Sequence, residues 1–397
     1  MLQVNYLAPA DQTGYACAAG QYVRALSRMG VSVCFQPLLP GPGLGLWYEC
    51  AATDMLPAGL REQCSATLFL DGISILHCVP EYYAPLTAWL RSRGVRGPIV
   101  GMTVWETTRI PQHWPALLQP LDALMAPSPW NVTLFRESGV SCPLFAVPHL
   151  SEFHGHAPQD ACLQALRVRL PSSSNRFLFY NVGTWSARKG NDLLVQAFLR
   201  AFAAREDVAL VLKTPATRTS APGGRLRRAF CRIVPSPMDR ARKLAEESPQ
   251  ILSIEEDWPS CEIAALHTLG GCYVSCTRGE GWGIGMYEAA LYGKPVLAPN
   301  EGGHRAYLTA EAEYGLVESA WSRIPSRDRD GSYTADQQWV ETDVETMAAR
   351  MQACFANRIA FKAKAAAVAR HLRETFSDES ITASLIENLQ ETMRAQR

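Results

Sequence analysis

The sequence lacks the features that mark several large classes of protein. Its 38 lysines and arginines balance 38 aspartates and glutamates, so the overall charge does not favour a nucleic-acid partner. No apolar run approaches the roughly 18 residues that a membrane-spanning helix requires. The first residues, MLQVNYLAPADQTGY, have neither the basic region nor the apolar stretch of a secretory leader. We therefore expect a cytoplasmic protein, at most peripheral at the inner face of the membrane.

Cysteine motifs typical of zinc sites or disulfide frameworks are also missing. Twelve cysteines are present, but none forms a C-x-x-C pair or a cysteine–histidine cluster with the spacing of a zinc site. Without an export signal, a disulfide framework is not expected. Cys34, Cys272 and Cys276 lie within apolar runs, so we predict that such cysteines act as small buried hydrophobes.

Lysine is scarce, and residues 1–150 contain none of the six in the chain. This part has eight arginines and nine acidic residues, which is not the basic balance of a surface that binds anionic lipid. The exception in the chain is Arg218–Lys243, where eight basic residues accompany the single acid Asp239. We expect a solvated surface there, with contact to an anionic acceptor or to lipid headgroups as the alternative. Membrane association should be weak at most.

The chain is long enough for two domains, since it has 397 residues of which 47% are hydrophobic. Short apolar strands alternate with amphipathic helices twice, on either side of a turn-rich stretch at 151–174. Such alternation predicts right-handed crossovers and two parallel sheets, an α/β fold. We predict a first domain at 1–160, a second at 175–375, and a C-terminal helix at 376–397 that packs back toward the first.

The predicted strands cover residues 4–7, 31–35, 67–70, 98–104, 124–127, 145–148, 177–182, 208–213, 251–254, 273–276 and 295–298. The predicted helices cover residues 16–29, 130–138, 191–203, 260–268, 285–292, 344–356, 361–375 and 381–393.

The segment richest in chemistry is CTRGEGWGIGMYE, residues 276–288. A strand ends near Cys276, and a helix follows the glycine-rich loop. Glycines let the backbone approach a ligand closely, and the free N–H groups at a helix start suit a phosphate. Glu280 and Glu288 would repel that phosphate, but carboxylates accept hydrogen bonds from hydroxyl groups. A phosphate flanked by two polyols describes a nucleotide-sugar.

Two other segments add positive charge at neighbouring strand ends. Arg188 and Lys189 precede Gly190 in the turn between the strand at 177–182 and its helix. Lys213 ends the next strand. Cations there can neutralise a diphosphate as it departs, which stabilises charge where it develops.

The segment EGWGIGMYEAALYGKPV resembles the E-x7-E signature of the retaining glycosyltransferases that have the GT-B fold. The RKG turn, Val147-Pro-His149 and the Thr13-Gly14-Tyr15 loop are also similar to that family, in the family's order. The resemblance implies two Rossmann-like domains that face each other across a cleft.

The resemblance also implies roles for matching positions. Glu280 would contact the donor sugar, Glu288 the ribose, and Lys189 the diphosphate, which the backbone of Gly14 would approach. Gly281, Trp282 and Gly283 would form the donor-binding loop. His77 and His149, at strand ends of the first domain, are candidates for the acceptor side, although structural histidines are the alternative.

The sequence departs from the family pattern in three places. Thr184 stands where many members have an arginine, and Arg188 or Lys213 can supply the missing charge. Gly285 replaces a proline. Glu106 stands where many members have a histidine over the donor sugar, which makes it a second candidate catalytic residue beside Glu280.

The implied activity is transfer of a sugar, with retention of anomeric configuration, from a nucleotide-diphosphate sugar to a glycan, lipid-linked or other hydroxyl acceptor. No metal or other cofactor is expected, because Asp328-Arg-Asp330 lies in a polar loop and not at the end of a strand. The alternatives are a nucleotide-sugar epimerase or hydrolase of the same fold and a non-catalytic nucleotide-sugar-binding subunit.

Overall fold

The computed structural model describes residues 2–10, 13–40, 47–49, 64–153, 158–170, 175–203, 205–216 and 236–396. The chain divides into two compact units. Unit 1 comprises Met1–Glu152, Arg329–Gln337 and Glu374–Arg397, and unit 2 comprises Phe153–Asp328 and Gln338–Arg373. Most of the basic stretch Arg218–Lys243 lies outside the described residues. None of the described helices is both long enough and apolar enough to cross a membrane.

Unit 1 is built on a seven-stranded sheet with the order β3-β2-β1-β4-β5-β6-β7. Its pairs are parallel except that of β2 with the edge strand β3. The elements are β1 (Gln3–Pro9), α1 (Gly14–Arg28), β2 (Ser32–Pro40), β3 (Trp47–Glu49), β4 (Ile73–His77), α3 (Tyr83–Ser92), β5 (Ile99–Met102), α4 (Trp114–Leu118), β6 (Ala123–Ala126), α5 (Pro129–Glu137), β7 (Leu144–Ala146) and, from the chain's end, α14 (Asp378–Ala395).

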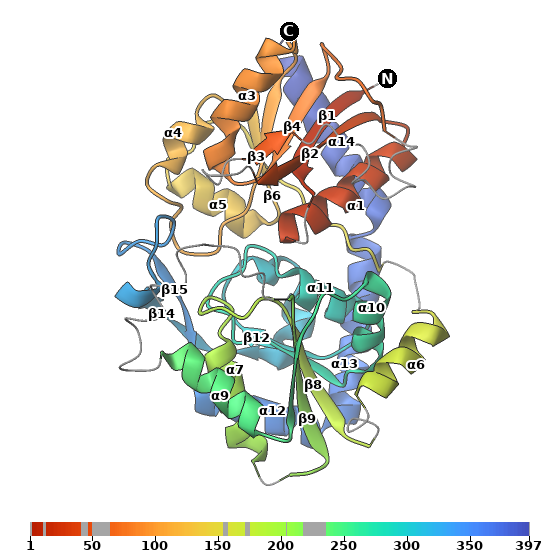
Figure 1. Cartoon of the computed structure of the whole chain (residues 1–397), viewed down its shortest axis with the longest axis vertical. Helices are drawn as coiled ribbons and strands as arrows, with labels where there is room; N and C mark the ends of the chain where they lie inside the picture. Colours follow the sequence, from red (N-terminus) through yellow and green to blue (C-terminus); the bar gives the residue numbers. More distant parts are fainter. Residues whose placement is uncertain are drawn as a thin grey trace. The chain divides into compact units, whose positions relative to one another are not determined.

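Helices cover both faces of this sheet, which explains why every residue of β4, β5 and β6 is buried. On one face α1 and α14 lie side by side (Figure 1), and Tyr22, Leu26 and Leu385 are among their core residues. The other face carries α3, α4 and α5. Side-chain caps fix where helices begin: Thr13 accepts from the amide of Ala16 at α1, and Ser377 caps α14 in the same way.

Unit 2 has a six-stranded sheet with the order β10-β9-β8-β11-β12-β13, parallel throughout. A helical layer of α7, α9 and α12 covers one face (Figure 1). The elements are α6 (Asp160–Arg169), β8 (Phe177–Val182), α7 (Asn191–Phe202), β9 (Val208–Thr214), α9 (Pro237–Glu247), β10 (Ile251–Glu255), α10 (Ser260–Leu269), β11 (Cys272–Val274), α11 (Ile284–Leu291), β12 (Val296–Pro299), β13 (Leu316–Val317), the antiparallel hairpin β14 (Ser319–Arg323) and β15 (Gln338–Thr342), α12 (Val344–Ala356) and α13 (Arg358–Thr375).

The predicted α/β class with two parallel sheets is confirmed, but one strand was misplaced. Residues 67–70 do not form a strand; they are an irregular segment, and the strand beside β1 is β4. The side chain of Asn5 on β1 holds this segment, donating to the carbonyl of Phe69 at 3.0 Å and accepting from its amide at 2.9 Å. The turn-rich stretch at 151–174 also contains α6, whose single buried residue Leu166 gives a weak helical pattern. Cys34, Cys272 and Cys276 are buried, as predicted.

Each sheet has a point at which its strand order reverses direction. In unit 1 the chain builds outward from β1 through β2 and then from β4 through β7, so the reversal lies between β1 and β4. In unit 2 it lies between β8 and β11. Loops that leave the carboxyl ends of such a strand pair diverge to opposite faces, and ligands of open α/β sheets bind in the space between them.

Candidate active site

The candidate site in unit 2 is formed by the two loops at its reversal point. One loop joins β8 to α7 and carries Arg188 and Lys189; the other joins β11 to α11 and carries Glu280. The side-chain amide of Asn181 fastens the two strands together, donating to the carbonyl of Val274 at 2.8 Å. The fold thus brings together two segments that lie about 90 residues apart in the sequence.

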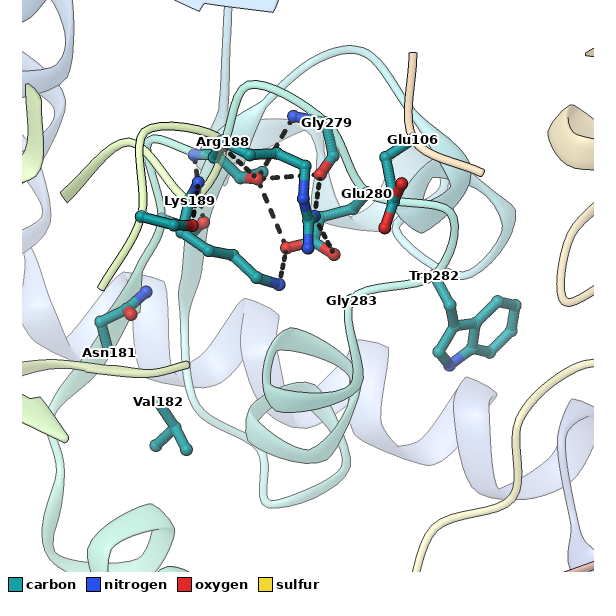
Figure 2. Close-up of polar contacts among 12 residues, drawn as sticks. Glu106, Asn181, Val182, Arg188, Lys189, Gly279, Glu280, Trp282 and Gly283 are labelled. Atoms are coloured by element: carbon teal, nitrogen blue, oxygen red, sulfur yellow. Dashed lines mark hydrogen bonds and ion pairs between the residues drawn. The ribbon is translucent and has the colours of Figure 1, made fainter. Parts of the chain in front are cut away.

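Lys189 and Glu280 form an ion pair at this point (Figure 2). The ammonium nitrogen of Lys189 lies 2.5 Å from Oε1 of Glu280, and the guanidinium of Arg188 lies 3.6 Å from Oε2. Arg188 also donates to the carbonyl of Gly279 at 2.7 Å. The side chain of Glu280 is only 10% exposed and that of Lys189 23%, so the pair is largely removed from water.

The charge of Glu280 depends on these cations. Burial by itself raises the pKa of this carboxyl, but Lys189 and Arg188 together outweigh burial and hold the pKa below its usual value of 4.5. His304 contributes in the same direction. Glu280 is therefore ionised at neutral pH and can accept hydrogen bonds from hydroxyl groups.

Glycine is required where the two loops approach each other. Gly190 has φ +64°, and a Cβ there would lie 1.9 Å from the carbonyl oxygen of Cys276. Gly283, the residue before α11, has φ +84°. Gly285 replaces the proline of the family pattern, and its place explains why: an added Cβ would lie 2.9 Å from the hydroxyl of Tyr273 and 3.0 Å from the carbonyl of Val182. The start of α11 therefore sits directly on the ends of β8 and β11.

Arg278 holds the glycine-rich loop in place, a role that sequence reasoning missed. Its guanidinium makes paired hydrogen bonds of 2.8 and 3.0 Å with Asp192 at the start of α7. It makes a second such pair with Glu341 on β15, at 2.8 and 3.0 Å, and donates to the carbonyl of Ala187. Bidentate pairing of this kind suits a planar guanidinium. Arg278 thus ties the loop of Glu280 to both the basic turn and the hairpin β14–β15.

The predicted loop residues Gly281, Trp282 and Gly283 lie between Glu280 and α11. The ring of Trp282 is 2% exposed and packs against Tyr287 and Tyr307, with centroids 5.2 and 4.8 Å apart. The hydroxyl of Tyr307 donates to the carbonyls of Trp282 and Gly283, each at 3.0 Å. The indole ring therefore belongs to the core beneath the loop.

Glu288 lies on α11 and is 9% exposed. Burial first, and then the charges of Glu280 and Glu288, raise the pKa of Tyr273, so both carboxylates lie near this one tyrosine. The hydroxyl of Tyr273 donates to the carbonyl of Val182, at the end of β8. The structure therefore places the two glutamates of the motif on the same edge of the sheet.

Lys213 ends β9, as predicted, but its ammonium is engaged on the β10 side. It donates to the carbonyls of Thr214 and Glu256 at 3.1 and 2.8 Å and lies over the ring of Trp258. Lys213 is 5% exposed, and burial lowers its pKa. Thr184, where many members of the family have arginine, is exposed.

In unit 1, Gly14 is the first residue of α1, directly after its N-cap Thr13. His77 ends β4 across the reversal point, with its Nδ1 2.8 Å from the hydroxyl of Tyr6. The Nδ1 of His149 lies 3.3 Å from the hydroxyl of Tyr22, and the two imidazoles stack at 6.4 Å. Burial lowers the pKa of His77 well below the usual value and that of His149 to about 4, so both are neutral at pH 7.

Glu106 follows β5 in unit 1 and meets a residue that sequence reasoning missed. Tyr333, in the segment Arg329–Gln337, points its hydroxyl to Oε2 of Glu106 at 3.5 Å, and its ring lies 5.3 Å from that of Trp105. Asp330 shapes this segment by accepting from the amides of Ser332 and Tyr333 at 2.7 and 2.9 Å.

Solved structures with the same architecture are numerous. HepE from Anabaena, crystallised with UDP and glucose, superposes with a TM-score of 0.69 at 14% identity, covering 98% of this chain and 100% of that one. Sucrose-phosphate synthase from Thermosynechococcus elongatus gives 0.68 at 14% identity, with both chains fully covered. A UDP-forming α,α-trehalose-phosphate synthase from Burkholderia xenovorans, in complex with glucose-6-phosphate, gives 0.66 at 13%, covering 98% of this chain and 100% of that one. The chain has the GT-B fold. No protein-family model and no curated protein sequence matches it.

The residues around the candidate site differ in whether the sequence alone could identify them. Glu280 and Lys189 stand in loops that follow strands, and Glu288 lies in the helix after the glycine-rich loop, so the sequence could single them out as candidates. Other residues can be identified only from contacts in the folded chain: Arg278, Tyr333 and His304. His304, for example, is fully buried, with Nε2 2.7 Å from the carbonyl of Pro299.

Proposed function

We propose that this protein is a glycosyltransferase that transfers a sugar from a UDP-sugar to a hydroxyl acceptor. The observation that carries the proposal is the ion pair of Lys189 with Glu280 at the reversal point of unit 2. A cation suited to a diphosphate and a carboxylate suited to sugar hydroxyls stand side by side there. UDP or UDP-glucose bound to HepE, which has the same fold, supports UDP as the nucleotide.

In this proposal each charged residue has a distinct task. The donor's diphosphate takes Lys189 away from Glu280 and is also neutralised by Arg188. Glu280, released from the lysine, accepts hydrogen bonds from the donor sugar, while Glu288 accepts from the ribose. The backbone amides around Gly281 and Gly283 face the phosphates at the start of α11. Lys213 adds long-range positive charge from the end of β9.

The chemical step is transfer with retention, without a metal or other cofactor. As the bond from the anomeric carbon to the phosphate oxygen breaks, Lys189 and Arg188 stabilise the charge that develops on the leaving diphosphate. The departing phosphate oxygen takes the proton of the acceptor hydroxyl as that hydroxyl attacks. The protein's contribution is positioning and charge neutralisation.

The acceptor binds unit 1 in this proposal, at the reversal point between β1 and β4. Gly14 and the neutral His77 and His149 lie there, and Glu106 follows the adjoining strand β5. A glycan or glycoconjugate hydroxyl suits these polar groups.

Incubation with UDP-, GDP- and ADP-sugars tests the proposal. Proton NMR follows the release of nucleoside diphosphate and the anomeric configuration of the product, with and without a panel of sugar acceptors. Turnover that requires an acceptor and retains configuration is the expected result. Conversion without any acceptor identifies an epimerase or hydrolase, and binding without product identifies a non-catalytic subunit.

A matched pair of variants guards against contaminating activity. Lys189→Ala removes the cation of the proposed site, whereas Lys243→Ala removes an exposed lysine whose side chain pairs with Glu247 at 3.6 Å on α9. Turnover should fall at least tenfold in the first and stay unchanged in the second.

A further inference from the structure

His267 is a buried histidine next to Glu288, one of the residues of the candidate site. It lies on α10, is fully buried, and places its Nε2 3.5 Å from Oε2 of Glu288, whose side chain is 12% exposed. This Nε2 makes no hydrogen bond with the described residues. A buried polar nitrogen next to a carboxylate of the site calls for an explanation, because leaving such a group unsatisfied is costly.

The hydrogen bond of the other ring nitrogen, Nδ1, determines which of the two nitrogens carries the hydrogen of the neutral imidazole. Nδ1 lies 3.0 Å from the hydroxyl of Tyr180 on β8. Burial, above all, raises the pKa of Tyr180 well above its usual value, so this hydroxyl keeps its proton and can donate it to Nδ1. We assign the donor role in this contact to the Tyr180 hydroxyl. An imidazole that accepts at Nδ1 carries its hydrogen at Nε2, the nitrogen that lies next to Glu288.

The imidazole is also fixed in orientation by aromatic rings. Tyr292 stacks on it at 5.4 Å with an interplanar angle of 18°. Tyr180 and Phe153 meet it edge-on, with centroids 5.6 and 6.0 Å away. The ring therefore cannot turn its Nε2 away from Glu288 without repacking this part of the core.

We propose that His267 is a positioning residue that orients Glu288 toward the ribose hydroxyls of a bound nucleotide. This inference rests on the proposed function. The proposed order of donation is Tyr180 hydroxyl to Nδ1, then Nε2–H to one oxygen of Glu288. The second step requires the 3.5 Å separation between these two atoms to shorten to hydrogen-bond distance when the nucleotide binds. A carboxylate held by one oxygen presents its other oxygen in a defined direction, which is what recognition of a diol requires.

Ligand pairs that differ only in the ribose hydroxyls test this role. Isothermal titration gives the dissociation constants of UDP and of 2′,3′-dideoxy-UDP, and their ratio isolates the hydroxyl contacts. We expect the wild type to prefer UDP by at least tenfold. His267→Phe keeps a ring but no donor and should lower that preference about five- to tenfold. This is less than the roughly tenfold or more expected for losing a hydrogen bond to a charged group, because Glu288 itself remains. The affinity for 2′,3′-dideoxy-UDP should stay within twofold.

Two further variants distinguish positioning from a purely structural role. His267→Gln retains an N–H at the position of Nε2 and should restore most of the preference for UDP. Tyr180→Phe removes the donor to Nδ1 and should also lower the preference for UDP. This variant provides the test if His267→Phe does not fold. An unchanged UDP preference in folded His267→Phe, or in folded Tyr180→Phe, overturns the inference. An equal affinity of the wild type for the two ligands also overturns the inference, because the ribose hydroxyls are then not recognised. Failure of the wild type to bind UDP overturns the proposed function in its choice of a UDP-sugar as donor.

Discussion

Replacing Lys189 with methionine removes the main cation beside Glu280 while keeping a side chain of similar length. Glu280 is then a buried carboxylate, 10% exposed, whose remaining cation is Arg188 at 3.6 Å. Breaking a fully buried pair costs about 3–5 kcal/mol, and a hydrogen bond to a charged group contributes about 1.5–3 kcal/mol. Because Arg188 remains, we expect a loss of about 1.5–3 kcal/mol in the free energy of unfolding at pH 7.

The dependence of this loss on pH identifies its cause. In the wild type the pKa of Glu280 is held below 4.5, so the ionised carboxylate stabilises the fold above that pH, and this contribution disappears as the pH falls through the folded-state pKa. Without Lys189, burial raises the pKa, and the carboxyl becomes protonated at a higher pH. The difference between wild type and Lys189→Met should therefore be largest near neutral pH and shrink toward pH 4 and below.

Urea denaturation of both proteins between pH 3.5 and 7.5 measures this difference. Lys243→Met is the matched control, since Lys243 and Glu247 form an exposed pair in which the side chains are 74% and 61% accessible. Exposed pairs of this kind contribute little, so the control should resemble the wild type at every pH. A difference for Lys189→Met that is below about 0.5 kcal/mol at pH 7, or that does not vary with pH, would refute the reasoning.

Three further predictions concern a loop glycine, the dependence of activity on metal ions, and binding to membranes. Gly190→Ala should abolish folding of unit 2 in circular dichroism melts, because its Cβ would lie 1.9 Å from a backbone carbonyl; Gly139→Ala, at φ +92° with nothing within 4 Å, should cost only about 1 kcal/mol. Transfer activity should survive excess EDTA, and loss of activity that manganese restores would contradict the proposed metal-independent mechanism. In liposome flotation at physiological salt, the protein should not bind phosphatidylglycerol vesicles tightly; binding that is lost when Arg225, Arg227 and Arg228 are neutralised would contradict this.

The alternation of strands and helices in the sequence was sufficient to predict two parallel sheets, but one strand was assigned wrongly. Residues 67–70 and 73–77 are both short apolar runs, so periodicity does not distinguish them. What decides between them is tertiary: β4 pairs with both β1 and β5, whereas the side chain of Asn5 holds the earlier segment out of the sheet.

The residues of the candidate site also differ in whether a local sequence pattern or a tertiary contact identifies them. Glu280 and Lys189 could be named as candidates from the sequence because glycine-rich and basic turns at strand ends carry local signals. His267 and Arg278 could not, because each acts on elements distant in sequence: His267 on Glu288, and Arg278 on Asp192 and Glu341. Glu341 lies in a hairpin of two five-residue strands, which are too short to give a clear periodic pattern in the sequence.

Nucleotide binding tests the central claim most directly. Isothermal titration with UDP should show saturable binding at one site per chain, weakened about ten- to hundredfold in both Lys189→Ala and Glu288→Ala, since each variant loses a charge-assisted contact. Glu280→Ala should bind UDP nearly as well as the wild type, because Glu280 contacts the sugar in this account. Absence of binding to UDP, GDP and ADP alike, or wild-type affinity in both the Lys189 and Glu288 variants, would contradict the proposed glycosyltransferase site.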